Sequence, residues 1–76
     1  MASNVNVNLR LSDQAYTERL ASFLRSLGQT AVIAGPGLVD LSLREENPES
    51  ARQEVEIYLR VWRVLYPDAE VTVSAD

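Results

Sequence analysis

The side chains of this chain that could carry out acid–base or metal chemistry are its carboxylates. The 76-residue sequence holds eleven Asp and Glu but no His, no Cys and no Lys. Imidazole and thiolate catalysis, disulfide bonds and every Cys/His zinc site are therefore excluded. Ser and Thr are present, but the chain has no ordinary base to activate them. A pair of carboxylates could still act as general acid and base, yet no spacing singles out two of them.

The densest group of acids consists of Asp40, Glu45, Glu46 and Glu49. Sites for Ca²⁺ or Mg²⁺ need several oxygens at fixed spacing, as in the twelve-residue loop of helix–loop–helix calcium proteins. This group lacks that spacing, and three of its members precede or open an expected helix, where the helix dipole favours negative charge. We therefore predict no metal, no cofactor and no catalytic residue.

The only glycine-rich element is Gly35-Pro36-Gly37. A phosphate-binding loop needs successive free amides followed by a helix. Pro36 has no amide hydrogen, and an extended pattern follows it. The tripeptide therefore predicts a tight turn between two strands.

The charge balance argues against nucleic acid and membranes as partners. Seven Arg against eleven acids give a net charge of −4, whereas polyanions require clustered cations. Arg52, Arg60 and Arg63 form a short strip that we interpret as a solvated helix face, with an acidic partner or a phosphate as the alternative. The longest apolar stretch, residues 31–34, is too short to span a membrane, and no export signal is visible. We expect a cytoplasmic protein.

Hydrophobic patterning predicts the elements that position these side chains. Strands are expected at residues 5–11, 30–34, 38–44 and 69–75, and the last should point Val71, Val73 and Ala75 inward. Ser12-Asp13 should cap a first helix that ends at Gly28, and Asn47-Pro48 should open a second that ends at Pro67. The expected core stripes are Tyr16, Leu20, Phe23, Leu24 and Leu27 in the first helix, and Ala51, Val55, Tyr58, Leu59, Trp62, Leu65 and Tyr66 in the second.

This order of elements predicts one α+β domain over residues 1–76. We expect a two-layer βαββαβ sandwich of ferredoxin-like type, with an antiparallel four-stranded sheet and both helices on one face. Right-handed crossovers should place the first and third strands at the centre. The order resembles that of small ferredoxin-like domains that serve as regulatory ligand-binding modules, including the ACT type. The resemblance implies a regulatory binding role, but the paired-Cys loop of metal-carrying members is absent.

The second helix carries an additional apolar stripe, formed by Ile57, Val61 and Val64. A helix on a sheet needs only one such stripe. The second could pack against the first helix or the chain ends, or it could form an interface with another subunit or a partner. A domain of this size has little stability margin, and dimerisation is a common remedy.

The outer face of the sheet should be polar, with Asn6, Asn8 and Arg10 from the first strand and Asp40, Ser42 and Arg44 from the third. Sheets of this topology that bind RNA use exposed aromatic side chains. No aromatic residue lies on the predicted strands, so RNA binding is disfavoured. The face is either solvent surface or a contact between two copies.

We therefore expect a non-catalytic interaction or regulatory module that self-associates or binds another protein. A small-molecule-sensing regulatory domain with its ligand at a dimer interface is the alternative, and a carboxylate-based enzyme is a remote one. The candidate interface residues are Ile57, Val61 and Val64 on the second helix and Asn6, Asn8 and Arg10 on the sheet.

Overall fold

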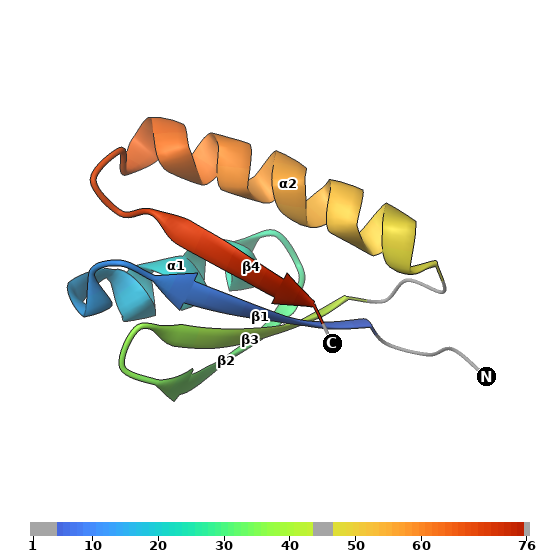
Figure 1. The fold of residues 1–76 in the computed structure, drawn as a ribbon, viewed down its shortest axis with the longest axis horizontal. Helices are drawn as coiled ribbons and strands as arrows, with labels where there is room; N and C mark the ends of the chain where they lie inside the picture. Colours follow the sequence, from blue (N-terminus) through green and yellow to red (C-terminus); the bar gives the residue numbers. More distant parts are fainter. Residues whose placement is uncertain (1–4, 44–46, 76) are drawn as a thin grey trace.

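The computed structural model describes residues 5–43 and 47–75. In chain order, as Figure 1 shows, the elements are β1 (Val5–Leu11), a 3₁₀ turn η1 (Gln14–Tyr16), α1 (Thr17–Ser26), β2 (Thr30–Gly35), β3 (Leu38–Leu43), α2 (Pro48–Leu65) and β4 (Val71–Ala75). The predicted α+β class is confirmed. The expectations for Arg44, Glu45, Glu46 and the side chain of Ala75 lie outside the described part of the chain.

The strands form one antiparallel sheet in the order β2-β3-β1-β4. The predicted central position of β1 and β3 is confirmed. Leu9 marks the middle of the sheet, since it lies opposite Val39 on one side and Val73 on the other. The two outermost strands, β2 and β4, each have one neighbour in the sheet.

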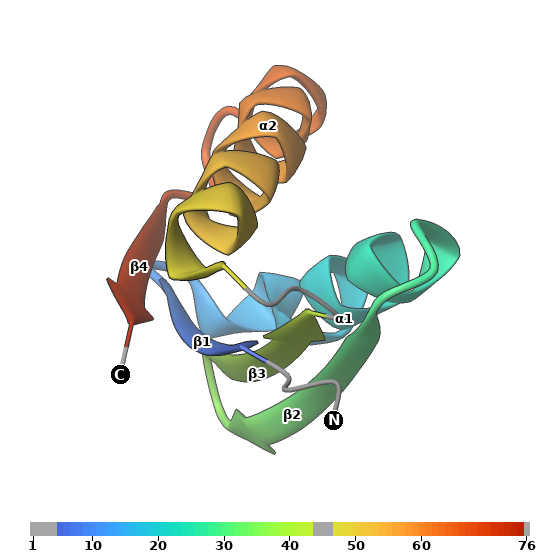
Figure 2. The ribbon, with the colours of Figure 1, turned by 90° about the vertical axis from the view of Figure 1, so that its right-hand side faces the viewer.

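Both helices cover the same face of the sheet, as Figure 2 shows. The alternation predicted for β1 and β3 is confirmed, because their inward side chains are buried and belong to one core with the helices. Val73 points inward as predicted, since it lies opposite the buried Leu9, but it remains 38% exposed because β4 has no further strand beside it. The inward strand residues of the core are Val7, Leu9, Leu11, Ala31, Val39, Leu41, Leu43 and Val71.

The start of the first helix is tighter than predicted. The Asp13 carboxylate accepts a hydrogen bond from the Ala15 N–H at 3.0 Å, so the expected cap forms, but it caps η1. The α-helix begins at Thr17. Leu27, predicted to lie in the core, is exposed, and Ala21 is buried instead.

The turn at Gly35-Pro36-Gly37 is tied to the start of α1 through a buried threonine. The Thr17 hydroxyl accepts from the Gly37 N–H at 2.8 Å and donates to the Gln14 carbonyl at 2.6 Å. The Gly37 carbonyl in turn accepts from the Leu11 N–H at 2.8 Å. The predicted turn is confirmed, and it is held on two sides.

The second helix begins as predicted, with the Asn47 side chain accepting from the Glu49 N–H at 2.9 Å. Its buried stripe consists of Ala51, Val55, Leu59 and Trp62. The Trp62 indole N–H donates to the Ala69 carbonyl at 3.0 Å, which fixes the chain between α2 and β4. The prediction that Leu65 is buried is wrong, since that side chain is 56% exposed. It lies at the edge of the stripe, beyond the arc that the sheet covers.

Gly28 ends α1 in the left-handed conformation that its position predicts, with φ of 85°. No atom lies within 4 Å of where a Cβ would be, so an added methyl group meets only the backbone cost of positive φ. We expect Gly28→Ala to lower the free energy of unfolding by about 1 kcal/mol, measured by urea denaturation. Gly28→Asn should cost less, because Asn tolerates this conformation. An alanine variant as stable as the parent would contradict the positive φ.

Candidate interaction surfaces

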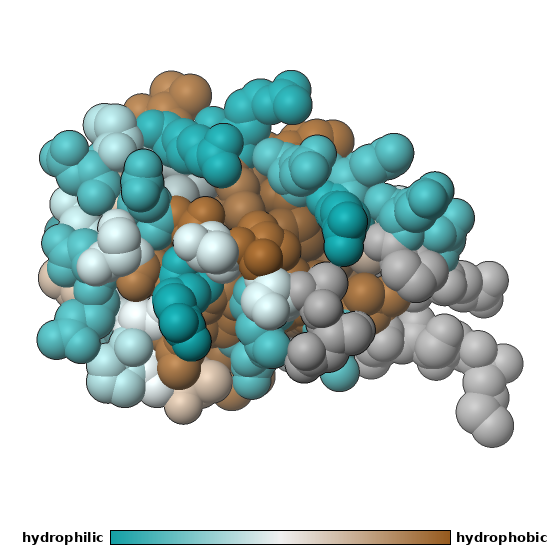
Figure 3. Space-filling view, viewed as in Figure 1, coloured by the Kyte–Doolittle hydropathy of each residue, from teal (hydrophilic) through white to brown (hydrophobic). Residues whose placement is uncertain are grey.

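The outer face of α2 exposes a row of branched apolar side chains. Ile57, Val61 and Val64 are 55%, 48% and 79% exposed, so within this chain they do not form part of the core. Leu65 extends the row, and we call these four residues the outer stripe. Figure 3 shows apolar side chains on the outer surface of α2, set among hydrophilic ones. The stripe follows from the spacing of four and three residues, which places side chains on one helix face.

The charged side chains of α2 are distributed unevenly along its length. Glu49, Glu54 and Glu56 lie in the first half, where Arg52 is the only cation. Arg60 and Arg63 lie in the second half, which has no acid. The helix is therefore acidic in its N-terminal half and basic in its C-terminal half, and the C-terminal half also holds the outer stripe.

The outer stripe continues into a hollow between the two helices. Leu65 lines this hollow of about 430 Å³ together with Phe23 and Tyr66. Glu18, Arg19 and Ser22 form the rest of its lining. The Arg19 guanidinium lies 5.4 Å and 5.7 Å from the ring centroids of Tyr16 and Tyr66, a cation–π arrangement. This contact was not predictable from local patterns, because Tyr16 and Tyr66 are 50 residues apart in the chain.

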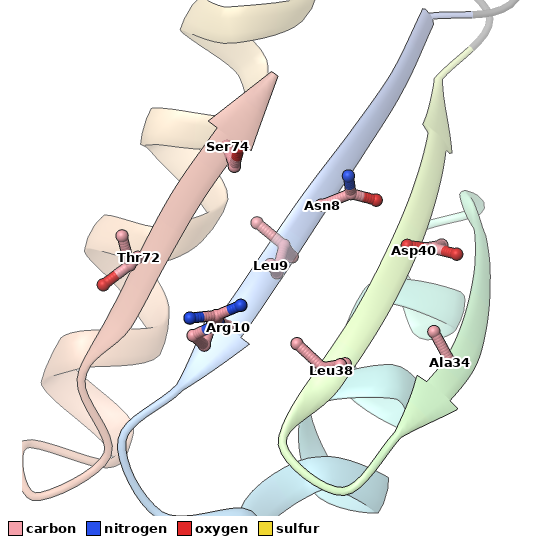
Figure 4. Close-up of a pocket in the computed structure, with 8 residues that line it drawn as sticks. All are labelled: Asn8, Leu9, Arg10, Ala34, Leu38, Asp40, Thr72 and Ser74. Atoms are coloured by element: carbon pink, nitrogen blue, oxygen red, sulfur yellow. The ribbon is translucent and has the colours of Figure 1, made fainter. Parts of the chain in front are cut away.

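On the open face of the sheet, β1 and β3 carry the predicted polar side chains, and β2 adds the exposed Val32. The Asn6 side-chain oxygen accepts from the Ser42 hydroxyl at 2.6 Å. Beside this pair lies a hollow of about 470 Å³, shown in Figure 4, where Asn8 and Arg10 come from β1, Asp40 from β3, and Thr72 and Ser74 from β4. The small side chains of β4 and Ala34 leave this space open.

The structure does not bring the two predicted sets of interface residues together. Ile57, Val61 and Val64 are exposed on α2, outside its buried stripe. Asn6, Asn8 and Arg10 alternate with the buried side chains of β1, so they lie on the face of the sheet that no helix covers. A flat partner surface could contact one set but not both. The two sets are therefore separate candidate surfaces.

Of the four acids considered as a cation site, the structure describes Asp40 and Glu49, and these two lie on different elements. Asp40 lies on the open sheet face and Glu49 in the first turn of α2. Over the described ranges, 5–43 and 47–75, no three acidic side chains cluster in a way that could hold a metal ion. In the same ranges no helix is long and apolar enough to cross a membrane.

Comparison with known protein families, with curated proteins and with solved structures gives no match.

Proposed function

We propose that this chain is a non-catalytic, self-associating interaction module of ferredoxin-like fold, in which the outer stripe of α2 binds the same stripe of a second copy. The observation that carries the proposal is the exposure of Ile57, Val61 and Val64 side by side on one helix face. Soluble monomers seldom expose contiguous apolar patches of this kind without a binding role. The strand order β2-β3-β1-β4 supports the proposed fold. A cytoplasmic location is part of the proposal, supported by a chain without Cys.

The outer stripe suits pairing with its own copy. Ile57, Val61 and Val64 recur at the four- and three-residue steps of a helix seam that packs side chains between two helices. Two identical stripes meet around a two-fold axis, so that each residue contacts its counterpart or a near neighbour.

The helix dipoles favour an antiparallel arrangement of the two helices, because it brings opposite ends of the dipoles toward each other. When the two outer stripes face each other in this arrangement, the helices overlap along their C-terminal halves, since all four stripe residues lie there.

Light scattering over a hundredfold concentration range tests the proposal. We expect a wild-type mass of at least about 17 kDa, twice that of the 8.5 kDa chain. Val64→Asp should lower the mass at every concentration and leave the far-UV circular dichroism unchanged, because this side chain is already 79% exposed.

Val32→Lys is the control, since it places a charge at a valine that is 55% exposed on β2, without setting a second carboxylate opposite Asp40. Val32 lies opposite Asp40, on the open face of the sheet. The control should keep the wild-type mass. A Val64→Asp variant of wild-type mass would overturn the proposal, and loss of mass in the control alone would move the interface to the sheet.

A small-molecule-sensing role is the second candidate, favoured by the hollow on the open sheet face. Arg10 and Asp40 supply a cation and an anion on neighbouring strands, and they line the same hollow as the hydroxyls of Thr72 and Ser74. The volume of the hollow, about 470 Å³, falls in the range of small-ligand sites. A screen of zwitterionic metabolites should then find a compound that raises the melting temperature, and Arg10→Gln should abolish the shift. If no compound shifts the melting temperature, the sensing role is excluded and the interaction module is the one function that stands.

A further inference from the structure

We propose that the edge of β4 pairs with β4 of another copy, antiparallel about a two-fold axis at Val73, as an interface separate from the outer stripe. Its first support is the direction of the backbone groups. The Ser12 N–H donates to the Glu70 carbonyl at 2.9 Å, in the row where these residues face each other. Bonded and non-bonded rows alternate in an antiparallel pair, so Thr72 and Ser74 also bond toward β1.

The backbone groups of Val71, Val73 and Ala75 consequently point away from β1, toward the edge of the sheet. These three residues would give an incoming strand one N–H and one carbonyl each. β4 carries no charged residue and no proline between its ends, and its register with β1 is unbroken. Such an edge is a template for another strand.

The opposite edge of the sheet is closed. The Arg25 side chain donates from Nε to the Ala31 carbonyl of β2 at 2.9 Å. The pairing of β2 with β3 also shifts register between Ile33 and Gly35, and Pro36 follows. A cationic side chain on the edge, a register shift and a proline are features with which proteins block strand addition. The edge of β4 has none of these three features, so it is the edge of the sheet that can accept another strand.

An apolar layer is exposed beside β4. Val73 points toward the helices and is still 38% exposed. Figure 3 shows a hydrophobic band at the centre of this view, between the places where α2 and β4 lie in Figure 1. A strand added at β4 would bring its own inward side chains against this band.

The occupant that fits this edge is β4 itself. With Val73 opposite the partner's Val73, Val71 lies opposite the partner's Ala75, and every outward backbone group meets its complement in about six hydrogen bonds. On the open face Thr72 lies opposite the partner's Ser74, a pair of hydroxyl side chains that suits cross-strand contact. The blocked edge at β2 stops strand addition after two copies.

The test combines changes at both interfaces in the full chain. Only the Val64→Asp variant rests on the proposed function. Thr72→Lys with Ser74→Lys places like charges opposite each other across the β4 pair, at exposed positions. Thr72→Lys with Ser74→Glu is the matched control, because it places opposite charges there and should keep the assembly. We expect a wild-type mass above 17 kDa. The double-lysine variant and Val64→Asp should each have a mass of about 17 kDa, because each keeps one of the two interfaces. All three changes together should give 8.5 kDa, the mass of one chain.

The failures of the two proposals give different results. A Val64→Asp variant that is monomeric overturns the β4 pair and leaves the outer stripe as the interface. A double-lysine variant that is monomeric overturns the outer stripe and leaves β4. Should the double-lysine variant lose its far-UV circular dichroism, amide exchange decides. In Val64→Asp the amides of Val71 and Val73 should be protected at high concentration and unprotected after dilution, while that of Thr72 is protected in both. Unprotected Val71 and Val73 at high concentration would overturn the β4 pair.

Discussion

Replacing Trp62 by alanine is expected to lower the free energy of unfolding by about 3–5 kcal/mol, the range for deleting a large buried aromatic side chain. Trp62 is fully buried, and its ring lies 4.4 Å from the Tyr66 centroid and 5.6 Å from that of Phe23. Its N–H also bonds the Ala69 carbonyl. Since domains are stable by about 5–15 kcal/mol and small ones lie at the low end, a large fraction of the variant should be unfolded at 25 °C.

Urea denaturation followed by far-UV circular dichroism measures this effect. Val32→Ala is the control, because Val32 is 55% exposed on β2 and lies outside both proposed interfaces. It should change the free energy of unfolding by no more than about 0.5 kcal/mol. Trp62→Phe should fall between the two, since it keeps a ring and leaves the Ala69 carbonyl without its partner. Equal losses in Trp62→Ala and Val32→Ala would contradict the burial of the indole.

Thr17→Val is expected to cost about 2–3 kcal/mol, although it replaces a polar side chain in the protein interior by an apolar one of the same shape. The Thr17 hydroxyl bonds both the Gly37 N–H and the Gln14 carbonyl. Valine would leave the Gly37 N–H buried and unpaired, and it would release the β2–β3 turn from the start of α1.

Thr17→Ser separates the hydrogen bonds from packing. Serine keeps the hydroxyl and loses one methyl group, so it should cost about 1 kcal/mol. Both variants are compared by thermal and urea unfolding. A valine variant that is more stable than the serine variant would show that shape, rather than the bond to Gly37, holds the turn.

The regular elements were predictable because their signals are local. The alternation in β1 and β3, the caps at Asp13 and Asn47 and the left-handed Gly28 each depend on residues within a few positions of one another. The exposure of Leu27, Leu65 and Val73 was not predictable from the apolar pattern. How wide a stripe is buried depends on what the facing element covers, and a strand at the edge of a sheet has a neighbour on one side only.

The candidate surfaces were predictable in part. The spacing of Ile57, Val61 and Val64 separated them from the core stripe, and the alternation in β1 placed Asn6 and Arg10 on the polar face. The contacts that distinguish the two sheet edges were not foreseen. Arg25 reaches the Ala31 carbonyl only because α1 lies along β2, and Thr17 meets Gly37 only because the turn folds back onto α1. Both depend on the packing of elements that are separated by loops.

The place of β1 in the sheet has a consequence for how the chain reaches its fold. Both strands that flank β1 come later in the sequence, and β4 is separated from it by nearly the whole chain. Few of the sheet's contacts with β1 are local, and such topologies fold slowly because the chain entropy lost in closing long loops precedes the gain from pairing. During synthesis the edge of β1 that pairs with β4 would stay unpaired until β4 has been made, and the apolar Leu9 and Leu11 lie on this strand. For this interval the nascent chain depends on whatever shields that edge from other strands.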